Sequence, residues 1–383
     1  MPTKRYLLTP GPTPVPPEVT AAMSAPIIGH RGGDFRRLLT ELLERLAQVF
    51  RTSNDVLLMT ASGTGAMESA VANTCSRGDR VVVVTAGNFG ERWVNLATAY
   101  GLDADVIRYT WGETPAAEDV AARLRELGGA RAVFFTHSET STGVVCDAEA
   151  IAAAAREAGA LSVLDAVSSL GAVPLETDEW GIDVVATGSQ KALMTPPGLA
   201  LVSVSAAAFE AAGRSTSPRF YFDWERARKA QQRPQTPFTP AISRVVGLNV
   251  ALGLLLKEGL EDAFDRHVRL GRACREGVKA MGLELFSPDE DRSAVVTAMR
   301  VPDGIDGQEI VAAVRERMGV TVAGGQGDLR GKIVRIGHLG YVDIFDVVTG
   351  LAAVELALAE AGADIERGAG PARALETFEH TPV

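Results

Sequence analysis

Cysteines are few and scattered in this sequence. The 383 residues include Cys75, Cys146 and Cys274, and no two of them form a Cys-x-x-Cys pair. Disulfide frameworks use even numbers of cysteines, and zinc or iron–sulfur sites use several ligands at short spacing. The sequence therefore favours neither a disulfide-stabilised fold nor a metal site.

Positive charge and long apolar runs are also scarce. Lys and Arg number 38 against 48 Asp and Glu, which gives a net charge of −10 at pH 7. Proteins that bind the nucleic-acid backbone need a basic surface, so we expect no nucleic-acid partner. The longest nearly apolar stretch, Val245 to Leu256, is shorter than the ~20 residues of a membrane-spanning helix, and no pattern typical of a secretory signal is seen. We expect a cytoplasmic protein with no membrane partner.

The sequence does have an ordinary globular composition and a regular alternation of strand and helix patterns. Hydrophobic residues make up 46% and charged residues 22%, as in a folded soluble domain. Short β-rich runs occur at 81–86, 105–110, 132–136, 161–166, 183–188 and 199–204, separated by helical stretches. This alternation predicts an α/β fold built on a parallel sheet.

The pattern changes after residue 205. A polar segment, 214–240, precedes one long helical pattern from about 242 to 280, and shorter strands and helices follow it. We predict an N-terminal segment at 1–15, a large domain at 16–250, a smaller α+β domain at 251–361 and a loosely ordered tail at 362–383.

An acidic residue and a lysine follow neighbouring strands. Asp165 ends one predicted strand, and Lys191 comes after the next. Because the carboxyl ends of parallel strands meet at one edge of a sheet, both side chains are expected at one crevice. Pyridoxal phosphate needs a lysine for its aldehyde and an acid for its ring nitrogen. The plainer alternative is that Asp165 caps a helix and Lys191 is a solvated loop residue.

Two turns are expected near the same edge. The segment ASGTGAMESAVANTC, 61–75, enters a helix with small residues, which suits a phosphate, although such turns often bind nothing and no convincing strand precedes this one. It lacks the third glycine of a dinucleotide-binding motif. The segment THSETSTGVV, 136–145, offers the hydroxyl of Thr140 and a histidine, His137, that is more often structural.

Six motifs in order resemble the class V aminotransferases of fold type I. They are PGPTPVP, SGTGAMES, HSETSTG, VLDAVSSLG, GSQKAL and GKIVRIGHLG, and they span roughly Leu7 to Ala361. The sequence is similar to the alanine/serine–glyoxylate aminotransferase group, and also to cyanobacterial proteins labelled as the soluble hydrogenase small subunit. The resemblance implies a pyridoxal 5'-phosphate (PLP) enzyme with a large, mixed, mainly parallel sheet, a smaller C-terminal α+β domain, and a homodimer with shared active sites.

The resemblance also implies residue roles. Lys191 is the catalytic lysine that binds the cofactor, and Asp165 is the catalytic partner of its ring nitrogen. Arg335 clamps the substrate carboxylate, although a salt bridge within the small domain is the alternative. Phe89 stands where relatives often have a tryptophan. The other implied cofactor-binding residues of the same subunit are Ser62, Gly63, Thr64, Thr140, Val167 and Gln190. Thr236 and Thr239 are implied to contact the phosphate bound by the neighbouring subunit. The other implied substrate-binding residues are Gly11 and Arg31.

The implied reaction moves an amino group from alanine or serine to glyoxylate or pyruvate. Arg31 leaves aspartate open as a donor, and (S)-ureidoglycine is another alternative. A PLP-dependent lyase such as a cysteine desulfurase needs a cysteine in a mobile loop, where none of the three is expected. A non-enzymatic subunit of a redox complex is the last alternative, and the pairing of Lys191 with Asp165 argues against it.

Overall fold

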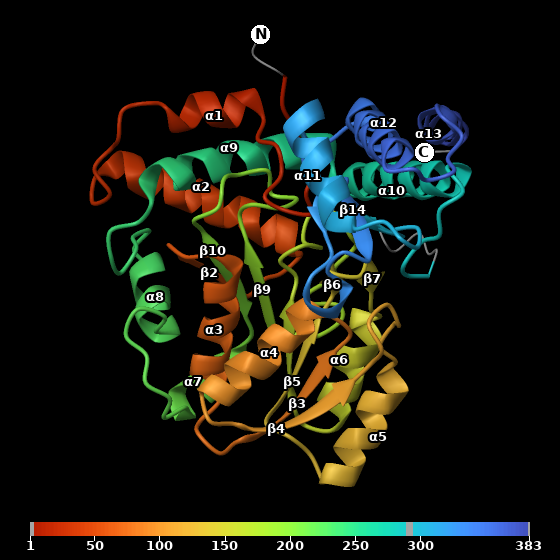
Figure 1. Cartoon of the computed structure of the whole chain (residues 1–383). Coiled ribbons are helices and arrows are strands. Elements are labelled where there is room, and N and C mark those ends of the chain that lie inside the picture. Colours follow the sequence, from red (N-terminus) through yellow and green to blue (C-terminus); the bar gives the residue numbers. More distant parts are fainter. Residues whose placement is uncertain (1–3, 289–293, 382–383) are drawn as a thin grey trace.

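The large sheet of the computed structural model has seven strands and is covered on both faces (Figure 1). The model describes residues 4–288 and 294–381. Only β10 runs antiparallel to its neighbours. The strand order is β2 (Asp55–Met59), β10 (Ala200–Val204), β9 (Val184–Gly188), β8 (Leu161–Asp165), β5 (Ala132–Thr136), β3 (Arg80–Thr85) and β4 (Asp103–Arg108). The predicted large, mixed and mainly parallel sheet is confirmed.

Alternate side chains of each strand enter two separate cores. In β3, Val81 and Val83 pack with one set of helices, whereas Val82 and Val84 pack with the other. The first set is α3 (Gly63–Thr74), α4 (Asn88–Ala99), α7 (Ala206–Arg214) and α8 (Trp224–Gln231). The second set is α2 (Gly33–Phe50), α5 (Ala117–Leu127), α6 (Ala148–Glu157) and α9 (Ile242–Glu258), with α1 (Pro17–Met23) against α9. Burial on both faces explains why the strands read as nearly continuous apolar runs.

A second, smaller sheet belongs to the C-terminal part of the chain. Its three antiparallel strands are β11 (Val296–Arg300), β14 (Ile333–Gly337) and β13 (Ala323–Gly324). Packed with it are α10 (Leu260–Ala280), α11 (Gly307–Met318) and α12 (Ile344–Glu360), and the short η1 (Gly327–Leu329) lies between β13 and β14 in the chain. These elements form the expected smaller α+β unit, drawn in cyan and blue in Figure 1. The exact domain boundaries stay predictions.

Two features differ from the sequence-based expectations. A strand, β2, does precede the turn at residues 61–63 directly. It is an edge strand bonded only to β10, and four of its five residues are apolar and buried. The single long helix expected from 242 to 280 is interrupted at Gly259. That residue has a φ of 98°, a conformation that favours glycine and ends α9 before α10 begins.

The segment at residues 6–13 runs from the small sheet to the large one. Strand β1 (Tyr6–Leu7) pairs in parallel with β12 (Val320–Thr321), and the N–H of Gly337 donates to the carbonyl of Leu8. A few residues later the hydroxyl of Thr13 donates to the carbonyl of Lys191 at 2.9 Å. The segment therefore connects the smaller unit to the lysine that the sequence singles out.

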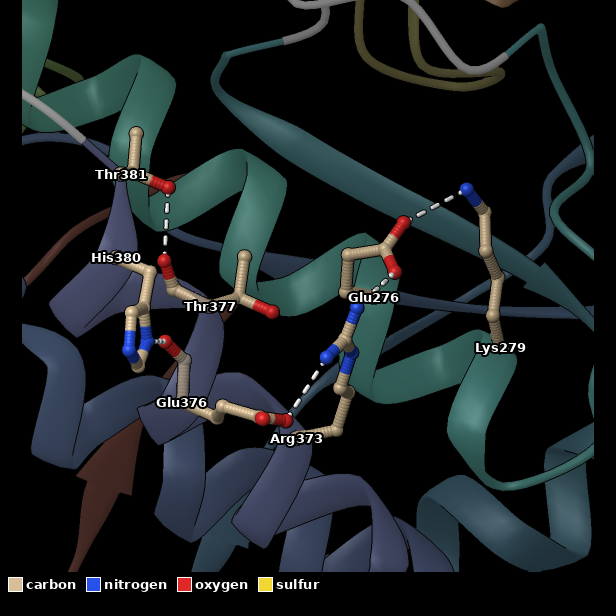
Figure 2. A network of polar contacts seen from close by, with 7 residues as sticks. All are labelled: Glu276, Lys279, Arg373, Glu376, Thr377, His380 and Thr381. Carbon is tan, nitrogen blue, oxygen red and sulfur yellow. Dashed lines mark hydrogen bonds and ion pairs between the residues drawn. The ribbon is translucent and has the colours of Figure 1, made fainter.

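Residues 362–381, where the sequence suggests loose order, include helix α13 (Ala369–His380) packed on α10 and α12. Small residues allow the close approach, since a Cβ added at Gly277 would lie 2.8 Å from the carbonyl oxygen of Gly370. Figure 2 shows Arg373 of α13 between two carboxylates, 3.4 Å from Glu276 and 2.8 Å from Glu376. Glycines and charged side chains make these contacts, and such residues give no apolar pattern in the sequence.

Among the described residues, no helix combines the length and the apolar character that crossing a lipid bilayer requires.

Candidate active site

A cavity of about 280 Å³ lies where the carboxyl ends of β8 and β9 meet the start of α3. It brings together most of the residues that the sequence analysis selected from distant motifs. Its lining consists of Gly11, Pro12, Ser62, Gly63, Thr64, Phe89, Arg92, Ser138, Asp165, Val167, Ser168, Gln190, Lys191 and Pro197.

Asp165 is the last residue of β8, and its side chain is buried. One carboxylate oxygen accepts a hydrogen bond from the N–H of Val167 at 2.8 Å, which orients the group at the strand end. Burial, with a smaller contribution from the charge of Glu139, raises the pKa of Asp165 to about 6, and the Val167 hydrogen bond opposes this shift. A cation held against this carboxylate would lower its pKa and keep it ionised.

Lys191 follows β9, and its side chain is also buried. Burial lowers the pKa of the Lys191 amine to about 8, although the negative charge of Asp165 opposes the shift. The Nζ atom donates to the carbonyl of Pro10 and lies 5.8 Å from the centre of the Phe89 ring. A neutral amine, the form that attacks a carbonyl, is therefore accessible near physiological pH.

Two glycines leave room for the side chains around this amine. Gly11 has a φ of 138°, and a Cβ there would lie 2.3 Å from Cε of Lys191. A Cβ at Gly63 would lie 2.6 Å from Cγ2 of Val167. Both distances are shorter than real contacts, so larger residues would displace Lys191 or Val167.

The start of α3 presents backbone donors to the cavity. Ser62 is its N-cap residue with extended backbone, but its side chain makes no capping hydrogen bond. The first N–H groups of a helix have no partner within the helix, and the helix dipole favours an anion there. Ser62, Gly63 and Thr64 all line the cavity, as expected of a phosphate-binding turn.

Two buried polar atoms at the cavity have no hydrogen-bond partner among the described residues. They are Oγ of Ser138 and Oε1 of Gln190. Buried polar groups are nearly always paired, and an unpaired one calls for a ligand or a water molecule. The cavity lining is therefore suited to a polar, anionic molecule.

Arg335, in β14, does not line the cavity, but it is hydrogen-bonded to Thr140, which lies two residues after the cavity residue Ser138. Its Nη1 donates to the carbonyl of Thr140 at 2.6 Å, and Nε and Nη2 donate to the carbonyl of Gly324 at 3.0 and 2.7 Å. Burial lowers the pKa of Arg335 to about 10, and the negative charge of Glu139 opposes this shift. No carboxylate within the described part of the chain forms an ion pair with it, so the salt bridge considered as an alternative is not seen there.

Glu139 is a buried residue of the site that the sequence analysis missed. Its carboxylate accepts hydrogen bonds from the N–H groups of Phe89 and Gly90, each at 2.9 Å, and from the N–H and hydroxyl of Ser141 at 3.1 and 2.5 Å. It lies within the quoted motif HSETSTG, between Ser138 and Thr140. The sequence gives no signal that its side chain reaches the start of α4.

Arg92 was missed as well. It follows Phe89 by three residues, so the two lie on one face of α4, and that spacing is the signal that was available. Its Nη1 donates to the hydroxyl of Thr64 at 3.0 Å, and its guanidinium carbon lies 4.7 Å from the centre of the Phe89 ring.

Thr140 is absent from the cavity lining, and three further predicted residues lie away from the cavity of their own chain. The Nη1 atom of Arg31 donates to Oε1 of Gln235 at 3.0 Å and to the carbonyl of Thr236 at 2.8 Å. Thr236 and Thr239 line a small surface hollow together with Tyr221. Within one chain, none of the three contacts the cavity.

The three cysteines are buried, and none of them is part of a disulfide bond. Burial raises the pKa of Cys75 to about 11 and that of Cys274 to about 12, which disfavours the reactive thiolate. None of the three lines the cavity. The arrangement does not provide the nucleophilic cysteine that a desulfurase needs.

Comparison with protein-family models matches residues 5–331 to the family described as aminotransferase class-V. A protein of Synechococcus sp. (strain PCC 6716) named soluble hydrogenase, small subunit, is 44% identical, with 98% of each chain covered. An L-aspartate–glyoxylate aminotransferase of Paracoccus denitrificans is 38% identical (100% of this chain and 98% of the relative covered), and a serine–glyoxylate aminotransferase of Methylorubrum extorquens is 36% identical with the same coverage.

Among solved structures, the ureidoglycine–glyoxylate aminotransferase of Bacillus subtilis superposes with a TM-score of 0.95. It is 31% identical in sequence, and 99% of each chain is covered. The similarity therefore includes the large sheet, the small sheet and the segment that connects them.

Proposed function

The chain belongs to the class V aminotransferase family, and from that premise we propose that it moves an amino group from alanine or serine to glyoxylate, with pyruvate as a second acceptor, using PLP. The observation that carries the proposal is the convergence of Lys191, Asp165 and the start of α3 on one cavity. Glyoxylate is favoured as acceptor because the names of three similar proteins combine it with three different donors.

The residues at the cavity fit PLP. This cofactor supplies an aldehyde that takes up the amino group and a ring that accepts electrons from the substrate. Lys191 would hold the aldehyde carbon, Asp165 the ring nitrogen, and the start of α3 the phosphate. Phe89 and Val167 would pack on the ring. The unpaired Oγ of Ser138 and Oε1 of Gln190 are consistent with a polar ligand that completes their hydrogen bonds.

Lys191 has the properties of the group that moves the substrate proton. Its amine, with a pKa near 8, is a base strong enough to accept a proton from the substrate Cα and weak enough to release it. The carbonyl of Pro10 and the close contact with Gly11 restrict where Nζ can lie. A fixed position lowers the entropic cost of proton transfer.

Asp165 supplies a negative charge for the ring nitrogen. Before any ligand is bound, and with Arg92 and Lys191 nearby, a pKa of about 6 leaves most of the carboxylate ionised at pH 7. The hydrogen bond from Val167 fixes its orientation, so no rearrangement is needed when a protonated nitrogen is bound.

Arg335 would bind the substrate carboxylate. Three of its five N–H hydrogens are used by the carbonyls of Gly324 and Thr140, which leaves one hydrogen on each terminal nitrogen. Two parallel N–H groups match the two oxygens of a carboxylate. The anchoring carbonyls would keep this fork in place between turnovers.

The proposed assembly is a homodimer in which Thr236 and Thr239 approach the partner's phosphate site. The support comes from the surface around them, where Phe220 is 66% exposed and the rings of Tyr221 and Phe238 stack 5.1 Å apart. Exposed aromatic groups of this kind are typical of protein interfaces. In such a dimer, Arg31, held by Thr236, is the group that would favour aspartate as a donor.

The absorbance spectrum of the purified protein between about 300 and 500 nm tests the proposal. With PLP bound to Lys191 we expect a band near ~420 nm, replaced by one near ~330 nm when alanine or serine is added, and restored by glyoxylate. The control is the Lys191→Ala variant, in which glyoxylate should not restore the longer-wavelength band. Absence of any cofactor band after incubation with PLP, or a band that neither amino acid alters, would overturn the proposal.

A further inference from the structure

Arg92 is held at the cavity by two residues of the proposed cofactor site. It lines the cavity itself, its Nη1 donates to the hydroxyl of Thr64, and its guanidinium group lies against the Phe89 ring. Thr64 is in the first turn of α3, so a cation is placed within one side chain's length of the helix end that favours an anion.

No carboxylate forms an ion pair with this cation among residues 4–288 and 294–381, although its charge lowers the pKa of the more distant Asp165 carboxylate. Glu91, which lies on the same helix as Arg92, pairs instead with Arg108 of β4. None of the ion pairs of the described residues includes Arg92. A partly buried cation without a directly paired carboxylate is costly, and a bound anion would supply that partner. The N-terminus of α3 beside it, which no side chain caps, would also be stabilised by a bound anion.

We propose that Arg92 is a further cofactor-binding residue, which pairs through its guanidinium group with the phosphate held at the start of α3. This inference rests on the proposed function, because it concerns the cofactor of the same site. It adds a full positive charge to a phosphate-binding turn that otherwise offers backbone N–H groups and hydroxyls. Its contact with Phe89 places that charge next to the ring-stacking residue.

The competing explanation is structural: Arg92 would only support Phe89 and Thr64. The two roles differ in their dependence on the phosphate. If Arg92 pairs with phosphate, its loss weakens the binding of PLP and leaves that of pyridoxal, which has no phosphate, almost unchanged. If its role is structural, both ligands lose affinity equally.

The experiment titrates the cofactor-free full-length protein with PLP and, separately, with pyridoxal. Arg92→Gln is expected to weaken PLP binding by roughly 10- to 100-fold, the loss typical of a hydrogen bond to a charged group, with pyridoxal affinity retained. Arg92→Lys should recover part of the PLP affinity, because it restores the charge without the planar fork. Arg108→Gln is the matched control and should bind both ligands as the wild type does.

Inorganic phosphate gives a second readout that does not involve the cofactor ring. It should raise the thermal midpoint of the wild-type protein and of Arg108→Gln, and raise that of Arg92→Gln much less. Equal losses for PLP and pyridoxal, or unchanged PLP affinity in Arg92→Gln, would overturn the role of Arg92. Failure of the wild type to bind either ligand would instead overturn the proposed function.

Discussion

The carboxylate of Glu139 holds the backbone of Phe89 in place. Its Oε2 accepts the N–H groups of Phe89 and Gly90, while Oε1 accepts two donors from Ser141. The turn that carries Thr140 is thereby fastened to the start of the helix that carries the ring-stacking residue. Positions on both sides of the cavity depend on one buried side chain.

Replacement of Glu139 by glutamine should loosen this arrangement. The amide keeps the shape but replaces one acceptor oxygen by an NH₂ group that faces N–H donors, so buried groups lose partners at a cost of about 1–3 kcal/mol. We expect Glu139→Gln to lower both the thermal midpoint and kcat. Glu91→Gln, which alters an exposed ion pair on the same helix, is the control. Equal behaviour of the two variants would contradict the role given to Glu139.

The contact between Gly63 and Val167 predicts a second effect. A methyl group at Gly63 would overlap the Val167 side chain, so Gly63→Ala should displace a residue that packs on the cofactor ring. We expect weaker PLP binding in a titration and a stability loss of about 1–3 kcal/mol. Gly213→Ala, at a helical glycine with open space around it, should be neutral or slightly stabilising. Unchanged PLP affinity in Gly63→Ala would show that Val167 can move freely.

Arg335→Lys should separate substrate binding from chemistry. Lysine keeps the charge but lacks the planar fork that matches a carboxylate. We expect KM for alanine and serine to rise by about 10- to 100-fold, corresponding to 1.4–2.8 kcal/mol, with a smaller change in kcat and an unaltered cofactor spectrum. Arg300→Lys, at an exposed arginine of the same small sheet, should leave KM unchanged. A loss confined to kcat would argue against carboxylate binding by Arg335.

The lowered pKa of Lys191 predicts how cofactor attachment depends on pH. The reactive form is the neutral amine, and a pKa near 8 means that its fraction rises about tenfold per pH unit below 8 and levels off above it. The rate of PLP attachment to the cofactor-free protein, followed by absorbance, should therefore increase from pH 6 to about 8 and then become constant. A rate that continued to rise towards pH 10 would indicate an ordinary, solvated lysine.

Helix α13 should contribute to stability without affecting the chemistry. A side chain at Gly370 would meet Met281 at 2.7 Å, so Gly370→Val should separate α13 from α10 and lower the thermal midpoint. Ala372→Val, at an exposed position of the same helix, is the control. Kinetic constants measured well below the midpoint should match the wild type in both variants. A loss of kcat in Gly370→Val would connect α13 to the active site.

The sequence predicts this fold where the signal is local. The central strands are apolar runs bounded by turns, and Asp165 and Lys191 follow two of them, so their convergence is a consequence of parallel strand geometry. The edge strand β2 was missed because its apolar run, Val56 to Met59, is so short that periodicity does not distinguish a strand from part of a helix. The interruption at Gly259 depends on a backbone conformation that its neighbours in the sequence do not reveal.

The rest of the site depends on contacts between distant residues. The hydrogen bonds of Glu139 to α4 and of Arg92 to α3 arise only once two helices and a loop are placed around the sheet. The packing of α13 on α10 was also not predictable from the sequence, because the glycines that permit it do not form an apolar stripe. Local patterns cannot encode such pairings, so the sequence identified the type of chemistry and left its supporting residues unassigned.

The parallel pairing of Tyr6 with Val320 also sets an order of assembly during synthesis. Residues 6–13 leave the ribosome early, but their partner strand follows after roughly 15–60 s at ~5–20 residues per second. Until then Pro10, Gly11 and Thr13 have no strand to align them, and the surroundings of Lys191 stay incomplete. The catalytic pocket should therefore be among the last parts of a newly made chain to form.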